Sequence, residues 1–550
     1  MALDFDDVLK DVGEFGRFQQ LLLIFVLLPP CLPGAFHGFS QIFVVATPSE
    51  FWCRNPKAGA ENLSQSDIQG LLPRRDDTDN TTYSQCLMYD FSQNSSDYHN
   101  RNWTSDGTVP CQYGWEFDRS VYQSTIVTDW NLVCDKSFLP TLSLFIHTLG
   151  TLLGTLISGY LTDEIGRKKT FCVAVILQLL TGATTVAAPD FITFCVIRFL
   201  NGLTIVPVWL IPLIMALEIT GPSKRAPVGT TTALCYTFGV ILLAGIAYGV
   251  RNWVHLQLAV TLPFTFLIGS IWWMPESPRW LMSRGKWDEM LVIVKKMARI
   301  NRVDLPADYF EELLVKCKAA RKADSEGRKR YRVVDIFRTP NLRKKSCLII
   351  FNSFCNYAVY SGLNFFAPQL GGDDHLNFLL SSLIELPAYT ILYFCLNRFG
   401  RRPLLTFSMI FGGSFLIAAA LVPEKNHLTV LFLFLISKFC MTCSFFVTDL
   451  VASETFPTVV RGAGASLTQT VSTIGLCLSP LIAHLGSHVI YLPLVIFGIL
   501  GIVGGAVTLL LPETVDQYLP ETMDEGEAFG KHMTWRDCFH LGKPKVTVKE

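Results

Sequence analysis

Twelve apolar runs, each of about 20 residues, are the feature of this 550-residue chain that most restricts its fold. A helix of that length spans the hydrocarbon core of a bilayer, because each residue adds about 1.5 Å along the axis. Composition agrees, since 50% of the residues are hydrophobic and only 17% are charged, whereas soluble domains are roughly a quarter charged. We therefore predict an all-α membrane protein with helices at 21–43, 139–161, 171–189, 191–216, 228–250, 255–274, 346–368, 377–396, 404–422, 428–450, 463–484 and 488–510.

A long polar loop, residues 47–138, separates the first two predicted helices. It carries four Asn-X-Ser/Thr sequons and 13 acidic against 7 basic residues, which favours a location outside the cell. It also holds four cysteines, an even number that suggests two disulfides with all three pairings open. The glycosylation candidates are Asn62, Asn80, Asn94 and Asn102, and the disulfide candidates are Cys53, Cys86, Cys111 and Cys134.

Basic residues predict the orientation. They occupy the short loops after the second, fourth, eighth and tenth helices, and residues 279–345 contain 19 basic against 9 acidic residues. Positive loops stay in the cytoplasm, and the start of the chain lacks a small-residue cleavage site. We therefore expect a multi-pass plasma-membrane protein with both termini in the cytoplasm. The predicted parts are a cytoplasmic N-terminus (1–20), a first six-helix bundle (21–274), a cytoplasmic linker with amphipathic helices (275–345), a second bundle (346–510) and a cytoplasmic tail (511–550).

The chain repeats three motifs at corresponding places in its two halves. Asp163-Glu-Ile-Gly-Arg-Lys-Lys follows the second helix, and Asn397-Arg-Phe-Gly-Arg-Arg-Pro follows the eighth. An acid and an arginine seven residues apart follow the fourth and the tenth helices, and Pro-Glu follows the sixth and the twelfth. Repeats of this kind predict two six-helix bundles related by a pseudo-two-fold axis along the membrane normal.

Acids and arginines at these helix ends can form ion pairs between helices and contacts with helix dipoles. Such pairs would close the cytoplasmic face in one state and break in another. The alternative is that the basic residues serve only as topology anchors. The predicted gate consists of Asp163, Arg167, Glu218, Arg225, Glu276, Arg398, Arg401, Glu454, Arg461 and Glu513.

Five motifs together resemble a known transporter family. GYLTDEIGRKK at 159–169 resembles the signature loop of the major facilitator superfamily. Combined with WEFDRSVYQSTIVTDWNLVCD before the second helix, Pro275-Glu-Ser-Pro-Arg-Trp-Leu, Ile384-Glu-Leu-Pro-Ala-Tyr and Glu454-Thr-Phe-Pro-Thr, it resembles the organic cation, carnitine and organic anion transporter family over nearly the whole chain. The resemblance implies the major facilitator fold and transport by alternating access. Sugar porters share the Pro-Glu-Ser-Pro-Arg-Trp element but lack the large loop.

The resemblance also bears on the charge of the substrate. Cation carriers of the family place an Asp, and anion and carnitine carriers an Arg, where this chain has Thr473, so the charge at this position gives neither answer; it shows only that the Arg of an anion carrier is absent. Anion carriers tend to have a Lys or Arg four residues after the acid of the eighth helix. This chain has Tyr389 there, and the carnitine-type members also have a tyrosine. This places the chain nearer the cation and carnitine branch, with amines and carnitine- or carcinine-like compounds as expected substrates. An organic anion transporter is the alternative, followed by a sugar porter.

Carboxylates and aromatic rings make up the expected substrate site. Glu385 and Asp449 lie at membrane depth, where a carboxylate must be paired or hydrated. The alternatives are a structural bond across helices for Glu385, and pairing with Lys438 or an arginine for Asp449. Aromatic faces attract amines, although any single ring is more often packing. The resemblance places Trp209 and Tyr360 in the cavity, and Phe36, Phe39, Tyr236, Tyr357 and Phe446 could complete an aromatic box.

Two further polar residues lie in predicted helices. His147 could couple transport to protons or be structural, and Arg198 could hold a substrate carboxylate or act as an anchor. The sequence has no HExxH, Walker or Cys-x-x-Cys motif, so we expect no enzyme activity, no cofactor and no metal. The expected partners are a small organic ion and the lipid bilayer, with the coupling ion open and no nucleic acid. A receptor or adhesion role for the outer loop is a third alternative. The paired motifs on the cytoplasmic side argue against it, because such a role would not require them.

Overall fold

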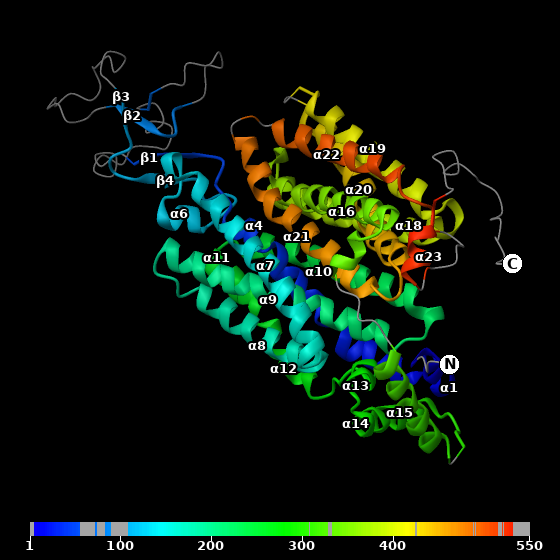
Figure 1. Ribbon diagram of the computed structural model, residues 1–550. Helices are drawn as coiled ribbons and strands as arrows, with labels where there is room; N and C mark the ends of the chain where they lie inside the picture. Colours follow the sequence, from blue (N-terminus) through cyan, green and yellow to red (C-terminus); the bar gives the residue numbers. More distant parts are fainter. Residues whose placement is uncertain are drawn as a thin grey trace, which may run out of the picture.

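The computed structural model describes residues 5–54, 72–73, 83–89, 108–306, 308–327, 333–423, 426–487, 489, 491–514, 520 and 522–531. The four sequon asparagines, Asn62, Asn80, Asn94 and Asn102, lie outside these residues. Helices dominate the described part and run side by side in two groups (Figure 1).

The first half contains helices at its six predicted positions. The first is broken where Pro29 and Pro30 each withhold a backbone N–H, between a π-helical turn, η1 (Leu23–Leu27), and the next segment. Its parts are α2 (Arg17–Leu22), η1, α3 (Cys31–Phe39) and α4 (Gln41–Val44), and the others are α7 (Phe138–Glu164), α8 (Arg167–Thr185), α9 (Phe191–Glu218), α10 (Arg225–Gly249), α11 (Trp253–Thr261) and α12 (Pro263–Ile271).

The second half repeats this arrangement. Its second member is divided at Ile384, directly before Glu385. The helices are α16 (Pro340–Phe366), α17 (Asp374–Leu383), α18 (Glu385–Phe399), α19 (Arg401–Ala420), α20 (His427–Thr455), α21 (Arg461–His484) and α22 (Leu492–Thr508).

Nine helical segments among the described residues are long and apolar enough to cross a membrane, and α22 is a shorter apolar helix. Two predicted spans, α8 and α16, are not among the nine. For α16 the packing explains this, because it lies between other helices and buries Asn352, Asn356 and Asn364 to within 1% of full burial. A helix surrounded by protein needs fewer apolar residues than one that faces lipid.

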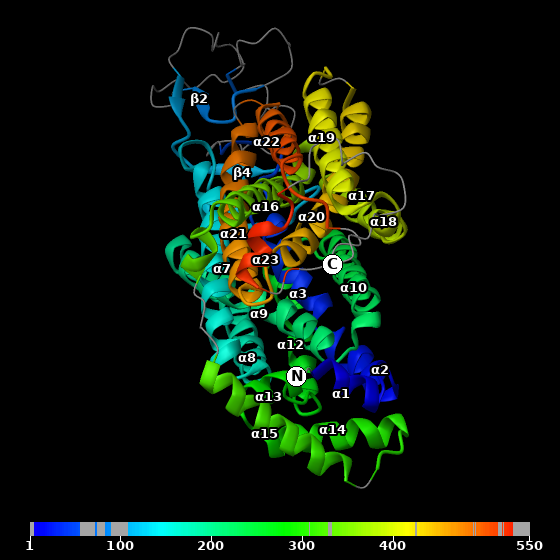
Figure 2. The same ribbon diagram turned by 45° about the vertical axis from the view of Figure 1, so that its right-hand side comes forward.

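Two features mark opposite ends of the bundle. At one end, β1 (Phe51–Cys53) pairs with β4 (Trp115–Phe117), β2 (Leu87–Tyr89) pairs with β3 (Thr108–Pro110), and disulfides join Cys53 to Cys111 and Cys86 to Cys134. We call this the disulfide end; α6 (Ile126–Trp130) lies beneath it. At the other, which we call the basic end, lie α1 (Phe5–Val12), α13 (Pro278–Arg284), α14 (Trp287–Asn301), α15 (Tyr309–Gly327) and α23 (Met523–Ala528) (Figures 1 and 2).

The two halves meet at the disulfide end. There one buried apolar cluster combines residues of both halves, including Phe39 and Phe43 of the first and Phe366 and Phe378 of the second. Toward the basic end the core divides into one cluster within the first half and another within the second. The structure is therefore closed at the disulfide end.

Polar contacts reinforce this closure. The Tyr122 hydroxyl donates to Asp374 at 2.9 Å, and the Thr141 hydroxyl lies 3.0 Å from Nδ1 of His484. The His375 ring stacks on Phe43 with centroids 5.2 Å apart. Each contact joins a residue of the first half to one of the second.

Candidate substrate site and gates

The turn between α7 and α8 is built around Gly166 and Glu276. Gly166 has φ +105°, a conformation that favours glycine, and a Cβ there would lie 2.5 Å from Oε2 of Glu276. The other oxygen of Glu276 accepts from the backbone N–H groups of Arg167 at 2.8 Å and Lys168 at 3.1 Å. A carboxylate thus satisfies the first amides of α8 and complements the helix dipole.

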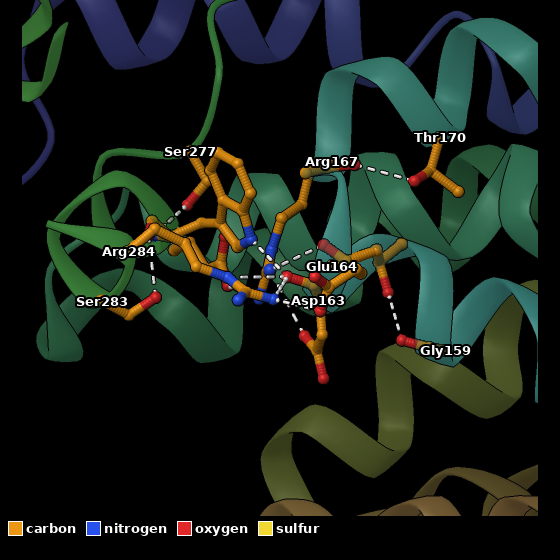
Figure 3. A network of polar contacts seen from close by, with 12 residues as sticks. Gly159, Asp163, Glu164, Arg167, Thr170, Ser277, Ser283 and Arg284 are labelled. Atoms are coloured by element: carbon orange, nitrogen blue, oxygen red, sulfur yellow. Dashed lines mark hydrogen bonds and ion pairs between the residues drawn. The ribbon is translucent and has the colours of Figure 1, made fainter. Parts of the chain in front are cut away.

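Ion pairs extend this cap to α7 and α9. The Arg167 guanidinium pairs with Glu218 at 3.1 Å and with the exposed Asp163 at 3.3 Å. The Asp163 carbonyl in turn accepts from Nε1 of Trp280 at 2.7 Å and from Arg284. In Figure 3, Asp163 of α7, Arg167 of α8 and Arg284 of α13 lie close together. The network therefore ties three transmembrane helices and the linker into one unit.

The second half contains the same network. Gly400 has φ +88°, and Glu513 accepts from the backbone N–H groups of Arg401 at 3.0 Å and Arg402 at 3.1 Å. The Arg401 guanidinium pairs with Glu454 at 3.5 Å. The two halves of the predicted internal repeat therefore share the same contacts: a glutamate caps the helix after the glycine, and the first arginine of that helix pairs with a second glutamate.

The remaining gate candidates have other contacts. Arg225 pairs with Asp6 of α1 and not with Glu218, and Asp6 also pairs with Arg279. Arg461 donates to the Phe456 carbonyl at 3.2 Å. Arg398 lies over the Phe399 ring at 5.9 Å. Among the described residues, none of these gate contacts joins the two bundles.

Glu385 is one of two deep carboxylates, and it is paired. It forms an ion pair of 2.8 Å with Lys438, and the two side chains are 3% and 0% exposed. It also accepts from the hydroxyls of Tyr360 at 2.9 Å and of Thr237, in the other half, at 3.2 Å. Lys438 further donates to Asn364 at 3.0 Å. Glu385 is therefore bonded across helices, as the structural alternative proposed.

Asp449 is the other deep carboxylate, and it is exposed. The Tyr357 hydroxyl lies 3.3 Å from Oδ2 of Asp449 and 3.0 Å from Oε1 of Gln469, so these two acceptors share its one hydrogen. Lys438 forms its ion pair with Glu385, so the alternative in which Lys438 pairs with Asp449 is not realised in this structure. A carboxylate with one hydroxyl partner can still receive a cation.

Aromatic rings surround these carboxylates. Tyr357 and Tyr360 both pack on Phe445, with centroids 4.6 and 4.3 Å apart. In the first half, the rings of Trp209 and Tyr236 pack together with their centroids 6.0 Å apart. Glu385 connects these rings: it accepts from Tyr360 at 2.9 Å and from Thr237, the residue after Tyr236, at 3.2 Å, and Tyr389 lies one turn further along α18.

Four predicted residues lie at the margin of this group. Phe446 contacts Tyr389 at 6.2 Å and not the tyrosines of α16. Thr473 is buried and donates to the Gln469 carbonyl at 2.8 Å. Phe36 and Phe39 are buried in the apolar cluster at the disulfide end, where Phe39 packs against Phe365 and Phe378.

Comparison with known proteins gives the family. Residues 81–525 match the model of the family described as "Sugar (and other) transporter". The chain is 39% identical to the beta-alanine transporter of Drosophila melanogaster, over 96% of this chain and 89% of that protein. It is 36% identical to the Drosophila carcinine transporter, over 99% and 82%, and 32% identical to human organic cation/carnitine transporter 2, over 95% and 94%.

The chain belongs to solute carrier family 22, the organic cation, carnitine and organic anion transporters. Membership of solute carrier family 22 makes the chain a multi-pass membrane transporter of small organic substrates and not an enzyme. We expected the chain to lie nearer the cation and carnitine branch, because the basic residues of anion carriers are absent at Tyr389 and Thr473. The organic cation, carcinine and carnitine transporters among its relatives confirm this.

Solved structures confirm the fold of this solute carrier family 22 member. The xylose transporter XylE of E. coli in an inward open conformation aligns with a TM-score of 0.58, covering 91% of this chain and 98% of that one. A partially occluded inward open form aligns at 0.59 over 90% and 99%. Sequence identity is 15% in both cases, so the likeness shows the fold alone. The prediction of twelve helices in two pseudo-symmetric bundles is confirmed.

Sequence reasoning missed three contributors to the site. Phe445, Gln469 and Thr237 contact the tyrosines or Glu385, yet each resembles an ordinary residue of a membrane helix. The only signal was that Phe445 and Thr237 directly adjoin the candidates Phe446 and Tyr236. At the basic end, Asp6 was also missed, because nothing local links it to arginines more than 200 residues away.

Proposed function

We propose that this transporter carries small amines, as organic cations or zwitterions, across the plasma membrane by alternating access, and that Asp449 meets the substrate's ammonium group. The observation that carries the proposal is the contrast between two deep carboxylates. Glu385 is buried and already bound to Lys438, whereas Asp449 is exposed and has Tyr357 as its partner.

Charge favours a cation over an anion. The ion pair of Lys438 and Glu385 contributes no net charge to the region, because the two groups compensate each other. Asp449 therefore leaves the region negative among the residues that the structure describes. An organic anion would meet that charge without a free lysine or arginine to balance it, which costs several kcal/mol for like charges at close range.

The rings support the same choice. A cation over a tyrosine or tryptophan face gains about 0.5–2 kcal/mol per contact. Tyr357 contacts Asp449 through its hydroxyl, and the rings of Tyr357 and Tyr360 both pack on Phe445. The first half contributes the packed pair Trp209 and Tyr236. β-Alanine, carcinine and carnitine, which appear in the names of relatives, all carry a charged nitrogen.

The proposed orientation puts the basic end in the cytoplasm and the disulfide end outside. Supporting this are the arginines of the two Gly-centred turns at one end and the disulfides, which form in oxidising compartments, at the other. The division follows the sequence: a cytoplasmic N-terminus to residue 20, bundles over 21–274 and 346–510, a linker between them and a cytoplasmic tail. With the disulfide end closed, Asp449 would face the cytoplasm in this state.

Uptake measurements in cells that express the chain test the proposal. Labelled carcinine as a cation, β-alanine as a zwitterion and an aromatic carboxylate as an anion are compared, with and without sodium and at clamped voltage. The expected result is uptake of at least one amine and none of the anion. The sodium and voltage dependence would identify the driving ion.

Asp449→Asn makes the test specific. A charge-assisted hydrogen bond contributes about 1.5–3 kcal/mol, and 1.4 kcal/mol is a factor of ten, so KM for the amine should rise about 10- to 100-fold. Asp288→Asn, an exposed acid of α14, is the matched control and should leave uptake unchanged. Uptake of the anion alone, or equal KM at equal surface expression for Asp449→Asn, would overturn the assignment.

A further inference from the structure

An apolar groove of about 490 Å³ lies in the second half, toward the basic end. Its walls are η5 (Val333–Phe337), the first turns of α16 and the first half of α21. Every side chain that lines the groove is apolar, counting Cys347 as a small hydrophobe. Val334 and Phe351 are 68% and 41% exposed, so the groove opens to the outside of the bundle.

The groove faces the position of the lipid. On α21, its lining residues Leu467 and Val471 share one helix face with Ile474 and Leu478, because the spacing is four, three and four residues. Ile474 and Leu478 are 41% and 37% exposed. A helix face that is both apolar and exposed, in a chain that spans a membrane, lies against hydrocarbon.

Two basic side chains lie where the groove begins on α16. Cys347, Phe351 and Phe354 line the groove from one face of this helix, and Arg343 and Lys344 precede Cys347 by one turn on the same face. Both basic residues are exposed. Neither forms an ion pair with a residue that the structure describes. Their positive charges are therefore available to a ligand.

The acids near this end of α16 have other partners. Asp335 of η5 pairs with Arg338 at 2.9 Å. Glu527 of α23 accepts from the first backbone N–H groups of α16 at 2.9 and 3.0 Å, so this helix end is already capped. The positive charge of Arg343 and Lys344 is thus not compensated by these carboxylates.

The length of the groove fits one leaflet of a bilayer. Ten residues separate Lys344 from Phe354, which is about 15 Å along a helix. This is half of the roughly 30 Å hydrocarbon core. If the two basic residues lie at the membrane surface, Phe354 lies near the bilayer midplane. A phospholipid has the same dimensions and the same order of charged and apolar parts.

We propose that this groove binds an acidic phospholipid, with one acyl chain between η5, α16 and α21 and the anionic headgroup at Arg343 and Lys344. In the orientation proposed above, this is the cytoplasmic leaflet, which carries the anionic lipids. A zwitterionic headgroup has no net charge to offer the two cations. The acyl chain excludes a purely water-soluble phosphate as the complete ligand.

The lipid would stabilise the contact between α16 and α21. These helices carry Tyr357 and Gln469, whose side chains lie 3.0 Å apart in the substrate region. A ligand that binds only the folded protein raises stability by mass action, in proportion to RT ln(1 + [L]/Kd). Stability should therefore depend on the acidic lipid in a saturable way, independently of any transported substrate.

Thermal unfolding of the purified full-length chain in a neutral detergent tests the site. Phosphatidylserine or phosphatidylcholine with identical acyl chains is titrated in, and the apparent Tm is followed by tryptophan fluorescence. At phosphatidylserine ten times above Kd the folded state gains a factor of about eleven, so Tm should rise by about 3–6 °C and then level off. Phosphatidylcholine should need a concentration at least tenfold higher.

Charge variants locate the headgroup. Arg343→Gln with Lys344→Gln should raise the half-saturating concentration of phosphatidylserine about 25-fold, because each basic residue near an anionic lipid contributes a factor of about five. Lys296→Gln with Arg299→Gln is the matched control. It removes two exposed charges of α14 at the same end and should leave the half-saturating concentration unchanged.

Two further measurements locate the acyl chain. Cys347→Trp fills the groove and keeps both charges, so it should also raise the half-saturating concentration at least tenfold. Glycerophosphoserine, the headgroup without acyl chains, should leave Tm unchanged. Equal shifts with the two phospholipids, or a shift with glycerophosphoserine, would overturn the proposal. So would an unchanged half-saturating concentration in the Arg343, Lys344 variant, which alters only exposed side chains and decides the matter if Cys347→Trp does not fold.

Discussion

The ion pair between Lys438 and Glu385 should be a major determinant of the stability of the second half. Lys438→Met removes the cation and keeps an apolar chain of similar length. Glu385 would then stay buried at 3% exposure with only the hydroxyls of Tyr360 and Thr237, and Asn364 would lose its donor. Removing one partner of a buried ion pair costs about 3–5 kcal/mol, because the other charge is left uncompensated.

This magnitude translates into a measurable shift. At about 2–4 °C per kcal/mol for a unit of 150–250 residues, the apparent Tm of Lys438→Met should fall by at least about 6 °C. Lys316→Met is the matched control, because Lys316 and Glu312 are 63% and 67% exposed and such pairs contribute little. Fluorescence-detected size exclusion after heating measures both variants in unpurified detergent extracts.

A double-mutant cycle separates pairing from packing. Glu385→Gln alone leaves Lys438 as the uncompensated charge, whereas Glu385→Gln with Lys438→Met removes both charges and keeps an amide beside Tyr360 and Thr237. The double variant should therefore be more stable than the sum of the single losses predicts, by at least about 1.5 kcal/mol. Additive losses, or a Lys438→Met variant as stable as the parent chain, would refute the reasoning.

Three other predictions concern separate parts of the structure. Gly166→Ala should lower stability by about 1–2 kcal/mol from its positive φ alone and displace Glu276, whereas Gly159→Ala, at an open helical position, should not; apparent Tm and uptake distinguish the two, and equal effects would remove the special role of Gly166. Cys53→Ser and Cys111→Ser should each reduce surface expression, with the double variant no worse than either, because both break one bond worth about 2–4 kcal/mol, while the free Cys347→Ser should have no effect. Tyr357→Phe keeps the ring but removes the hydroxyl between Asp449 and Gln469, so KM for an amine should rise about 2- to 10-fold with expression unchanged; an unaltered KM would mean that this hydroxyl does not orient Asp449.

Much of the fold could be predicted from the sequence because its signals are local. Apolar length predicts the helices, and the repeated Gly-Arg and Pro-Glu motifs predict two similar halves. The sequence named Glu276 and Glu513 as members of the gate, but it did not show that they cap the first turns of α8 and α19. Each accepts from backbone amides more than 100 residues earlier in the chain, a relation that only the packed structure brings about.

The substrate region was harder to predict because helix rotation decides it. Lys438 lies on the same helix as Asp449, yet it turns toward Glu385 of α18. Phe445 and Phe446 are adjacent, but neighbouring residues point about 100° apart on a helix. Only Phe445 faces Tyr357 and Tyr360, whereas Phe446 contacts Tyr389. A sequence identifies such residues as a group without showing which one contacts the site.

The position of the ion pairs bears on how such a carrier could switch. With the disulfide end closed, the pairs Arg167–Glu218 and Arg401–Glu454 are intact, and each joins helices of one half. We infer that these networks keep each bundle rigid, so that a motion of one bundle against the other need not break them. The contacts that such a motion must break lie at the disulfide end, where Tyr122 binds Asp374 and Phe43 stacks on His375. Since these few polar contacts are weak individually, the buried apolar cluster shared by both halves should supply most of the energy that holds this state closed.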